Sequence, residues 1–351
     1  MEVVVVGAGI VGAAVAYEAA RAGADVVLLD RALPASGVTA DSFAWIGGPR
    51  GADVPDAGTA LRREVLQDYR RLEDEVPGVQ VRWTGALIWG EDELDEDRLA
   101  PDEHLVGPTE VGLLEPRLRV PPARAVHVES HGAVDPVAVT QALVRAAQGY
   151  GARLMANTAV TALDVRDRHV IGVRTSSGSV RADTVVLTAG VDAPMLCRPL
   201  GFDLPVAPSP ALLIRFTAPP GLVRTLVATP DLEVREAADG QLLVPAEYTG
   251  EIDDDDLRRA GETMLRRLTA GFDAPDVELV SVRLGSRPMP ADGLPIIGRL
   301  PGVGGAYIAV MHSGVTLAPT AARLIASEIV AGVDADQLAG LRPARFASRA
   351  E

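Results

Sequence analysis

The sequence predicts an α/β fold in which two domains are interleaved along the chain, one built on a parallel sheet and the other a strand-rich α+β domain. Three observations predict it. The β-branched run Glu2–Val6 opens directly into a glycine-rich turn and a helical pattern. A second apolar run, residues 182–190, has the composition of a strand buried on both faces. Beyond it, residues 205–281 carry mostly strand patterns.

The first strand leads into Gly7-Ala-Gly-Ile-Val-Gly12, a Gly-x-Gly-x-x-Gly motif. In such a motif the first glycine makes the tight turn, the second lets the backbone approach a pyrophosphate, and the third lets the helix pack closely on the strand. Gly7, Gly9 and Gly12 therefore predict a Rossmann-type dinucleotide site. The alternative is a glycine-rich turn in another α/β protein, and the order of strand, glycines, helix, strand and acid argues against it.

The helix after the motif is expected at residues 10–22. Ile10 and Val11 fall in its first turn, where N–H groups and the positive end of the helix dipole face a phosphate. The second strand, residues 24–30, ends on Asp30, eighteen residues after Gly12 and near the spacing at which a carboxylate binds a ribose hydroxyl. Asp30 is the ribose candidate, and Arg31 beside it is a further cofactor-binding candidate.

The following segment, residues 33–48, is turn-rich and too polar for a core strand, so we expect a loop laid along a ligand. Asp135 and Pro136 suit the cap and first position of a helix. The other expected helices are residues 59–75, 137–150, 253–268 and 317–330, and the other expected strands are residues 81–89, 152–155, 160–165, 211–216, 241–245, 282–286 and 307–310. We assign residues 1–78, 135–200 and 282–351 to the nucleotide-binding domain and residues 79–134 and 201–281 to the second domain.

Composition narrows the function classes. A net charge of −15 and a pI near 4.8 argue against a nucleic-acid groove or a polybasic membrane surface. No apolar run approaches the roughly 20 residues of a spanning helix, and the first strand begins at residue 2, so we expect a cytoplasmic protein without a membrane span. The single cysteine, Cys197, allows no internal disulfide, and the histidines lack metal-ligand spacing. All 33 basic residues are arginines, which excludes Schiff-base and phosphate-loop lysines.

The C-terminal part holds two further segments. The first is Arg287-Pro-Met-Pro-Ala-Asp-Gly-Leu-Pro-Ile-Ile-Gly298, and the second is His312-Ser-Gly-Val-Thr316, which follows a buried strand and opens a helix. A helix N-terminus there can stabilise negative charge through the N–H groups of Gly314, Val315 and Thr316. The alternative is an ordinary loop that ends in a helix cap.

Together these motifs resemble the D-amino-acid oxidase superfamily of FAD enzymes, which includes glycine oxidase, sarcosine oxidase and D-amino-acid dehydrogenases. The resemblance covers nearly the full chain and rests on the glycine motif with Asp30, residues 36–42, residues 182–190 and the two C-terminal segments. It implies a Rossmann-type FAD-binding domain interleaved with a strand-rich α+β substrate domain, and FAD bound without a covalent link. The implied FAD-binding residues are Gly7, Gly9, Ile10, Val11, Gly12, Asp30, Arg31, Ser36, Thr39, Ala40, Ser42, Val160, Ala189, Gly190, Arg287, Ser313, Gly314, Val315 and Thr316.

The resemblance also implies catalytic and substrate-binding residues. A guanidinium can hold a carboxylate with two parallel hydrogen bonds, and the resemblance gives this role to Arg287; a surface arginine is the alternative. Counting from Gly240, Glu233 falls where glycine oxidase has a tyrosine, and Tyr248 falls near another pocket residue. Glu233 would pair with a cationic amine, or would be a solvent-facing strand residue.

The implied reaction is oxidation of the CH–NH bond of an amino acid or secondary amine that carries a carboxylate. A hydride passes to flavin N5, the imine hydrolyses, and oxygen or another acceptor reoxidises the flavin. Sarcosine oxidases activate oxygen with a lysine, which is absent here, so His312 is the candidate for that charge or for substrate binding. Three alternatives stay open: an FAD-dependent 2-hydroxy-acid oxidase or dehydrogenase, an NAD-dependent dehydrogenase, and the flavin subunit of a larger dehydrogenase complex. A homo-oligomer is also possible.

Overall fold

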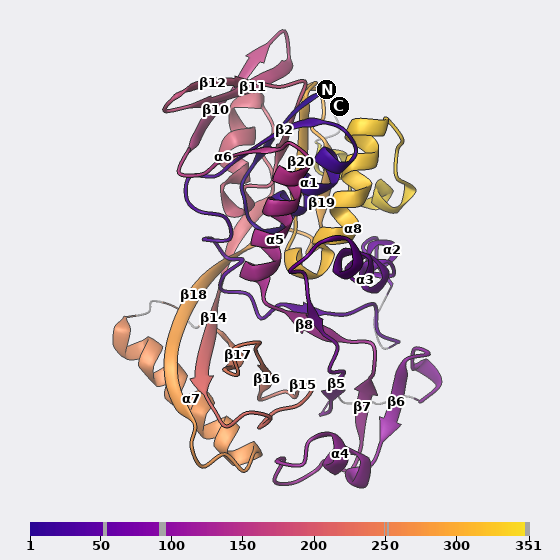
Figure 1. The fold of residues 1–351 in the computed structure, drawn as a ribbon, viewed down its shortest axis with the longest axis vertical. Helices are drawn as coiled ribbons and strands as arrows, with labels where there is room; N and C mark the ends of the chain where they lie inside the picture. The colour runs from indigo at the N-terminus through magenta and orange to yellow at the C-terminus, as the bar shows by residue number, and fades with distance from the viewer. Residues whose placement is uncertain (52–54, 91–95, 249, 251–252, 348–351) are drawn as a thin grey trace.

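The computed structural model describes residues 1–51, 55–90, 96–248, 250 and 253–347, and it has two lobes (Figure 1). The upper lobe is built on a six-stranded sheet in the order β19-β20-β13-β1-β2-β9. Five of these strands are parallel and β19 runs antiparallel to β20. The strands are β1 (Glu2–Val6), β2 (Asp25–Leu29), β9 (Arg153–Met155), β13 (Thr184–Leu187), β19 (Ile296–Arg299) and β20 (Ala306–Val310).

Helices cover one face of this sheet and a second, smaller sheet covers the other. Val3 and Val5 of β1 pack with α1 (Ile10–Arg21), α5 (Pro136–Gly149) and α8 (Gly314–Ala326). Val4 and Val6 point the opposite way, toward the three-stranded sheet of β10 (Val160–Arg166), β11 (His169–Thr175) and β12 (Gly178–Arg181). The four consecutive valines are therefore all buried, as in a strand covered on both faces.

The lower lobe is built on an eight-stranded sheet in the order β18-β14-β17-β16-β15-β5-β7-β6 (Figure 1). One face packs against α7 (Asp254–Gly271) through Ile214, Phe216 and Leu268, and the other face contacts Phe43 from the upper lobe through Leu213 and Leu243. The strands are β5 (Ala86–Ile88), β6 (Glu103–Val106), β7 (Ala125–Val128), β14 (Val206–Thr217), β15 (Leu226–Ala228), β16 (Glu233–Glu236), β17 (Leu242–Glu247) and β18 (Glu278–Pro290).

A small third sheet, in the order β3-β8-β4, pairs chain segments that are far apart in the sequence. Its strands are β3 (Trp45–Ile46), β4 (Val81–Arg82) and β8 (Gly132–Val134). The remaining helices are α2 (Thr59–Arg62), α3 (Val65–Glu75), α4 (Pro108–Leu114) and α6 (Ala193–Cys197). Short 3-10 helices lie at Glu96–Arg98, Gly190–Asp192, Arg198–Leu200, Asp336–Leu341 and Pro343–Phe346, and a π turn at Ser327–Ala331 extends α8.

The predicted fold class is confirmed, with local corrections. The helix expected at residues 59–75 is divided into α2 and α3, and the strand expected at residues 81–89 becomes β4 and β5 in different sheets, with Gly85 at a φ of 71° between them. The helix expected from residue 317 begins at Gly314. Asp135 caps α5 as predicted, because its carboxylate accepts hydrogen bonds from Val137 N and Ala138 N.

The long strand β18 crosses the domain boundary expected at residue 282. It pairs with β14 from Val206 to Thr217, so residues 282–290 continue the sheet of the lower lobe before the chain re-enters the upper lobe at β19. The division into two domains otherwise stays a prediction.

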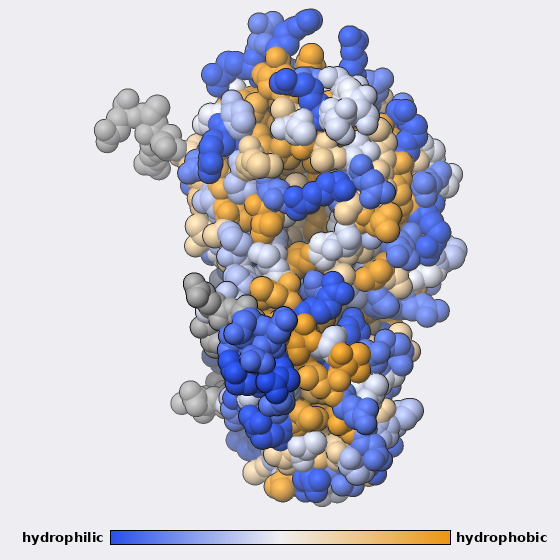
Figure 2. All heavy atoms as spheres, turned by 90° about the vertical axis from the view of Figure 1, so that its left-hand side faces the viewer, coloured by the Kyte–Doolittle hydropathy of each residue, from blue (hydrophilic) through white to orange (hydrophobic). Residues whose placement is uncertain are grey.

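Figure 2 shows that hydrophilic and apolar side chains are mixed on the face that carries α7 and β18. On the edge strand β18, Val280 and Leu284 are 47% and 46% exposed. Exposed single apolar side chains are normal for soluble proteins.

One described helix, Gly314–Ala331, is long and apolar enough to cross a membrane. Of that window, 67% is buried inside the protein, as in a core helix. Its residues Ala318, Ala321 and Ala322 pack in the main core of the upper lobe.

Candidate functional site

The glycine motif brings α1 against the end of β13 with no room for side chains. A Cβ added to Gly12 would lie 1.8 Å from the carbonyl oxygen of Gly7 and 2.6 Å from Thr188 Oγ1. Gly7 has a φ of 107°, and a Cβ there would lie 2.7 Å from the carbonyl oxygen of Thr188. The loop therefore presents bare backbone at the start of α1, which is the form that a bound pyrophosphate needs.

The start of α1 keeps donors available for an anion. Its N-cap is Gly9, which has no side chain, and one first-turn donor, Ile10 N, is bonded to Thr39 Oγ1 at 3.2 Å. Thr39 is buried at this position. The other N–H groups of the first turn have no intrahelical acceptor, so they are available to a phosphate.

Asp30 lies at the end of β2, beside the glycine loop. Its carboxylate accepts hydrogen bonds from Ala8 N at 2.7 Å and from Ala32 N at 2.8 Å. A carboxylate has about four acceptor positions, so two remain for ribose hydroxyls. Arg31 forms an ion pair with Asp192 at 2.5 Å and joins this edge to the turn that follows β13.

The other predicted cofactor residues surround this loop. Ser36, Ala40 and Ser42 lie in the turns between β2 and β3, and Ser42 Oγ accepts a hydrogen bond from Ala44 N at 3.2 Å. Val160 begins β10, and Ala189 and Gly190 follow β13 directly.

The start of α8 lies next to the start of α1. A Cβ added to Gly314 would lie 3.3 Å from Val11 Cγ2. Two hydrogen bonds hold this turn: Thr316 Oγ1 donates to Trp45 O at 2.7 Å, and the Tyr69 hydroxyl donates to Val315 O at 2.6 Å. The N–H groups of Val315 and Thr316 belong to the first turn and have no intrahelical acceptor. The N-termini of α1 and α8, each of which carries a partial positive charge, therefore lie next to each other.

A cavity of about 320 Å³ lies where the two lobes meet, beside this turn. The upper lobe contributes the start of α8, the end of α2 and the segment around β3, and the lower lobe contributes adjacent residues of β5, β15 and β16. The lining residues are Trp45, Gly47, Gly48, Arg50, Arg62, Ile88, His131, Ala228, Glu233, Ser313 and Thr316.

Glu233 faces this cavity from β16, in register with Ala228 of β15. Burial raises its pKa, because desolvation disfavours the charged carboxylate. Two residues further along the same strand face, Arg235 donates to Phe43 O at 2.6 Å and to Val134 O at 3.1 Å. Burial, together with the Arg82 and Arg215 guanidiniums, lowers the pKa of Arg235 to about 9.

Arg287 lies on β18 opposite Ser209, outside the residues that line the cavity. Its Nε donates to Ser209 O at 3.2 Å and its Nη2 to Ser209 Oγ at 2.9 Å. On the same strand face, Arg283 forms an ion pair with Asp41 at 2.6 Å. This face of β18 therefore contacts the loop between β2 and β3.

His312 is exposed and directly precedes Ser313, which lines the cavity. Partial desolvation lowers its pKa, and the charges of Arg287 and Arg62 lower it further. Desolvation and both guanidiniums therefore favour the neutral imidazole of His312.

The structure does not bring Tyr248 into the cavity lining. It follows Glu247, the last residue of β17, which pairs with Ala211; Ala211 in turn pairs with Gly285. Tyr248 therefore lies near the level of Arg287 on the sheet, but two strands away.

Among the lining residues not predicted as site residues, four carry polar side-chain groups: Trp45, Arg50, Arg62 and His131. Trp45 falls in the segment that we expected along a ligand, and its Nε1 donates to His131 Nδ1 at 3.0 Å. Arg62 ends a helix with mixed charges, a pattern typical of a solvated face, so no sequence signal separated it from other arginines.

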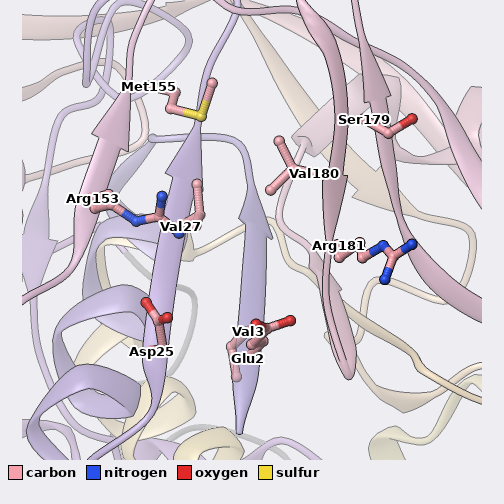
Figure 3. Close-up of a pocket in the computed structure, with 9 residues that line it drawn as sticks. All are labelled: Glu2, Val3, Asp25, Val27, Arg153, Met155, Ser179, Val180 and Arg181. Atoms are coloured by element: carbon pink, nitrogen blue, oxygen red, sulfur yellow. The ribbon is translucent and has the colours of Figure 1, made fainter.

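A second cavity, of about 350 Å³, lies at the opposite end of the main sheet, where strands β1, β2 and β9 begin (Figure 3). Its lining comes from the first residues of β1, β2 and β9, including Glu2, Asp25 and Arg153, and from β12. Ligands of parallel α/β sheets bind beyond the carboxyl ends of the strands, so we give this second cavity no role in the reaction.

Other reactive groups are scarce in the part of the chain that the structure describes. It contains no group of three or more His, Cys, Asp or Glu side chains that could hold a metal ion. Cys197 is buried, and burial raises the pKa of its thiol to about 12, so it packs as an apolar residue.

A glycine cradle, an acid at the end of the second strand and a cavity between the lobes are the features of a dinucleotide-binding protein with a separate ligand cavity. The family model described as "FAD dependent oxidoreductase" (DAO) matches residues 2–328. The chain belongs to this family, and it is an enzyme with FAD as its cofactor.

Similar proteins cover nearly the whole chain. Glycine oxidase of Pseudomonas aeruginosa is 28% identical over 92% of this chain and 93% of its own length. The structure of iminodiacetate oxidase from a Chelativorans species has a TM-score of 0.82 and 26% identity, and covers 97% of this chain and 98% of that one. L-amino acid deaminase from Proteus vulgaris shares the fold, with a TM-score of 0.86 at 22% identity over 98% of this chain and 93% of that one.

The close approach at Gly12 makes a direct prediction about the cofactor. In Gly12→Ala the new methyl group has no space, because its nearest neighbour is a backbone oxygen, so the loop must open and FAD is lost. The purified variant should show little flavin absorbance per chain. In the control Gly149→Ala, near the end of α5, the added methyl meets nothing within 4 Å, and the flavin content should stay normal. Full flavin content in Gly12→Ala would contradict this role.

The raised pKa of Glu233 predicts a stability cost. Because the folded-state pKa lies above the unfolded one, the folded protein loses stability as pH rises from the unfolded pKa through the folded one. Glu233→Gln should therefore unfold at a higher temperature than the native protein at pH 8, and the difference should disappear in acid. The exposed Glu247→Gln should show no such trend. Equal melting temperatures for Glu233→Gln and the native protein at pH 8 would show that the charged Glu233 carboxylate does not destabilise the folded protein.

Proposed function

We propose that this protein oxidises the CH–NH bond of an amino acid or secondary amine that carries a carboxylate. The observation that carries the proposal is the cavity beside the first turn of α8, which combines the half-buried carboxylate of Glu233 with arginine side chains. Relatives named glycine oxidase and iminodiacetate oxidase, by their names, act on small amines with carboxylates, which supports the same class.

Arginine side chains in the cavity lining, together with Arg287 on β18, would bind and orient such a substrate. Planar guanidiniums hold carboxylates with parallel hydrogen bonds, and Arg287 is fixed in orientation by its two bonds to Ser209. Orientation matters because the reacting C–H bond has to meet its acceptor at close range. Trp45, Gly47 and Gly48 form part of the cavity lining.

Glu233 is suited to take a proton from the substrate ammonium. Only the neutral amine can lose hydride from its α carbon, and burial raises the pKa of Glu233, so that its carboxylate accepts a proton more readily than an exposed one. FAD, when bound, would serve as the hydride acceptor. The N–H groups at the start of α8 would stabilise negative charge that develops there. The imine product leaves and hydrolyses in water, and oxygen or another acceptor removes the electrons.

A 2-hydroxy acid is the second candidate substrate class. Its oxidation requires a base for the hydroxyl proton, and the lowered pKa of His312 keeps that imidazole neutral and able to accept a proton.

Anaerobic reduction of the flavin distinguishes these classes. The holoenzyme is mixed without oxygen with D- and L-amino acids, N-methyl amino acids and 2-hydroxy acids, and the flavin absorbance is followed. The proposal predicts bleaching by a member of the amine group. Bleaching by hydroxy acids alone would support the second candidate, and a flavin that neither group reduces would point to a subunit that serves a larger dehydrogenase complex.

Arg287→Ala tests the carboxylate contact. Hydrogen bonds to a charged group contribute about 1.5–3 kcal/mol, so KM for the best carboxylate substrate should rise roughly 10- to 150-fold. Arg198→Ala, an exposed arginine of the upper lobe, should leave KM unchanged. An unchanged KM in Arg287→Ala would remove this role.

A further inference from the structure

We propose that the preferred substrate is a secondary amine with a carboxylate on each of its two arms, one bound by Arg62 and the other by Arg287. The inference rests on the proposed function and specifies its substrate class. It starts from an observation that the predicted site residues do not explain, which is the presence of two arginines, Arg50 and Arg62, in the cavity lining.

Arg62 has most of its hydrogen-bonding capacity available. Within the described residues, its guanidinium makes one hydrogen bond, from Nη1 to Asp56 Oδ2 at 3.3 Å. The two side chains are 31% and 35% exposed, and an ion pair so open to water contributes little. The Nε and Nη2 donors form the planar fork that matches a carboxylate.

Arg50, the other arginine of the lining, is held by a protein carboxylate. Its Nε lies 3.4 Å from Glu103 Oε1, and the Glu103 side chain is almost fully buried, at 1% exposure. Glu103 also accepts hydrogen bonds from Gly51 N and Ala100 N, which fix it in place. The charge of Arg50 is therefore balanced within the protein, and Arg62 is the better anchor for a ligand.

Arg287 has a neutral partner. Both of its hydrogen bonds go to Ser209, which fixes the orientation of the guanidinium without balancing its charge. Among the described residues no carboxylate lies within ion-pair distance of Arg287, so the cation is balanced when an anionic ligand binds.

Arg62 lines the cavity together with Ser313, and His312 directly precedes Ser313. The charges of Arg62 and Arg287 both act on His312. Arg62 lies at the end of α2 and Arg287 lies on β18, so separate elements hold the two guanidiniums. Two binding groups on separate elements are suited to the two ends of an extended substrate.

The charges of the site and of such a ligand are complementary. Among the described residues Arg287 has no carboxylate partner and Arg62 has only the water-exposed Asp56, so each guanidinium can receive a substrate carboxylate. The ammonium between the two carboxylates can then lie next to Glu233. Glycine or N-methylglycine, each with one carboxylate, leaves one of the two guanidiniums without a substrate contact.

Iminodiacetate and N-methylglycine form a matched pair for the test, because they differ by a single carboxylate. We expect the native holoenzyme to have a higher kcat/KM for iminodiacetate. Arg62→Gln should lower the ratio of the two kcat/KM values roughly 10- to 150-fold, from the loss of hydrogen bonds to a charged group. Arg62→Lys, which keeps the charge, should restore part of the ratio. The neighbouring exposed Arg63→Gln is the matched control and should leave the ratio unchanged.

Two results would overturn the inference. Native enzyme that shows no preference for iminodiacetate would remove the second carboxylate site. A loss in Arg62→Gln that is equal for both substrates would show that Arg62 and Arg287 hold the same carboxylate.

A binding experiment separates this inference from the proposed function. Thiodiacetate has sulfur in place of the NH group, so it cannot be oxidised as an amine, and its binding is followed by the change in the flavin spectrum. Thiodiacetate should bind more tightly than (methylthio)acetate, the thioether that carries a single carboxylate. Arg62→Gln should abolish this difference in affinity. Equal binding of the two ligands to native protein would refute the two-carboxylate site, whereas failure of all amines to bleach the flavin would refute the proposed function itself.

Discussion

The whole arrangement depends on the close approach between the start of α1 and the end of β13. Gly12 lies against the carbonyl oxygen of Gly7 and the hydroxyl of Thr188 with no space for even a methyl group. Thr188 Oγ1 donates to the carbonyl oxygens of Val6 and Gly7, so β1, the glycine loop and β13 are joined at one point. Because residues from both halves of the chain meet there, the cofactor site can form only when the discontinuous upper lobe is complete.

The substrate side is joined to this cradle by arginines of the lower lobe. Arg283 pairs with Asp41, and Arg235 donates to the carbonyl oxygen of Phe43, so the loop between β2 and β3 is held from the second sheet. The hydrogen bond from Thr316 to Trp45 O connects the same loop to α8. One segment thus contacts the upper lobe, the lower lobe and the first turn of α8, which explains how a cavity between the lobes keeps a defined shape.

Features that arise from local patterns and motifs could be predicted from the sequence, and the others depend on tertiary contacts. The glycine spacing and the β-branched runs located the cradle and its sheet, and the cap at Asp135 was evident from two residues. The break of residues 81–89 at Gly85 was not predictable from alternation, because the pattern continues while the strands join different sheets. Arg62 could not be distinguished among 33 arginines, since its role arises only where α2 meets the lower lobe. Glu233 was located by counting along one strand, and Tyr248, located in the same way, falls outside the cavity lining.

The central claim is that the cavity at the junction delivers the α C–H bond of an amine to the flavin. Anaerobic stopped-flow measurement of flavin reduction, with the best amine of the panel and its α-deuterated form, tests it directly. Hydride transfer from the α carbon predicts that the deuterated amine reduces the flavin several-fold more slowly at saturation. Equal reduction rates at saturation would contradict the claim.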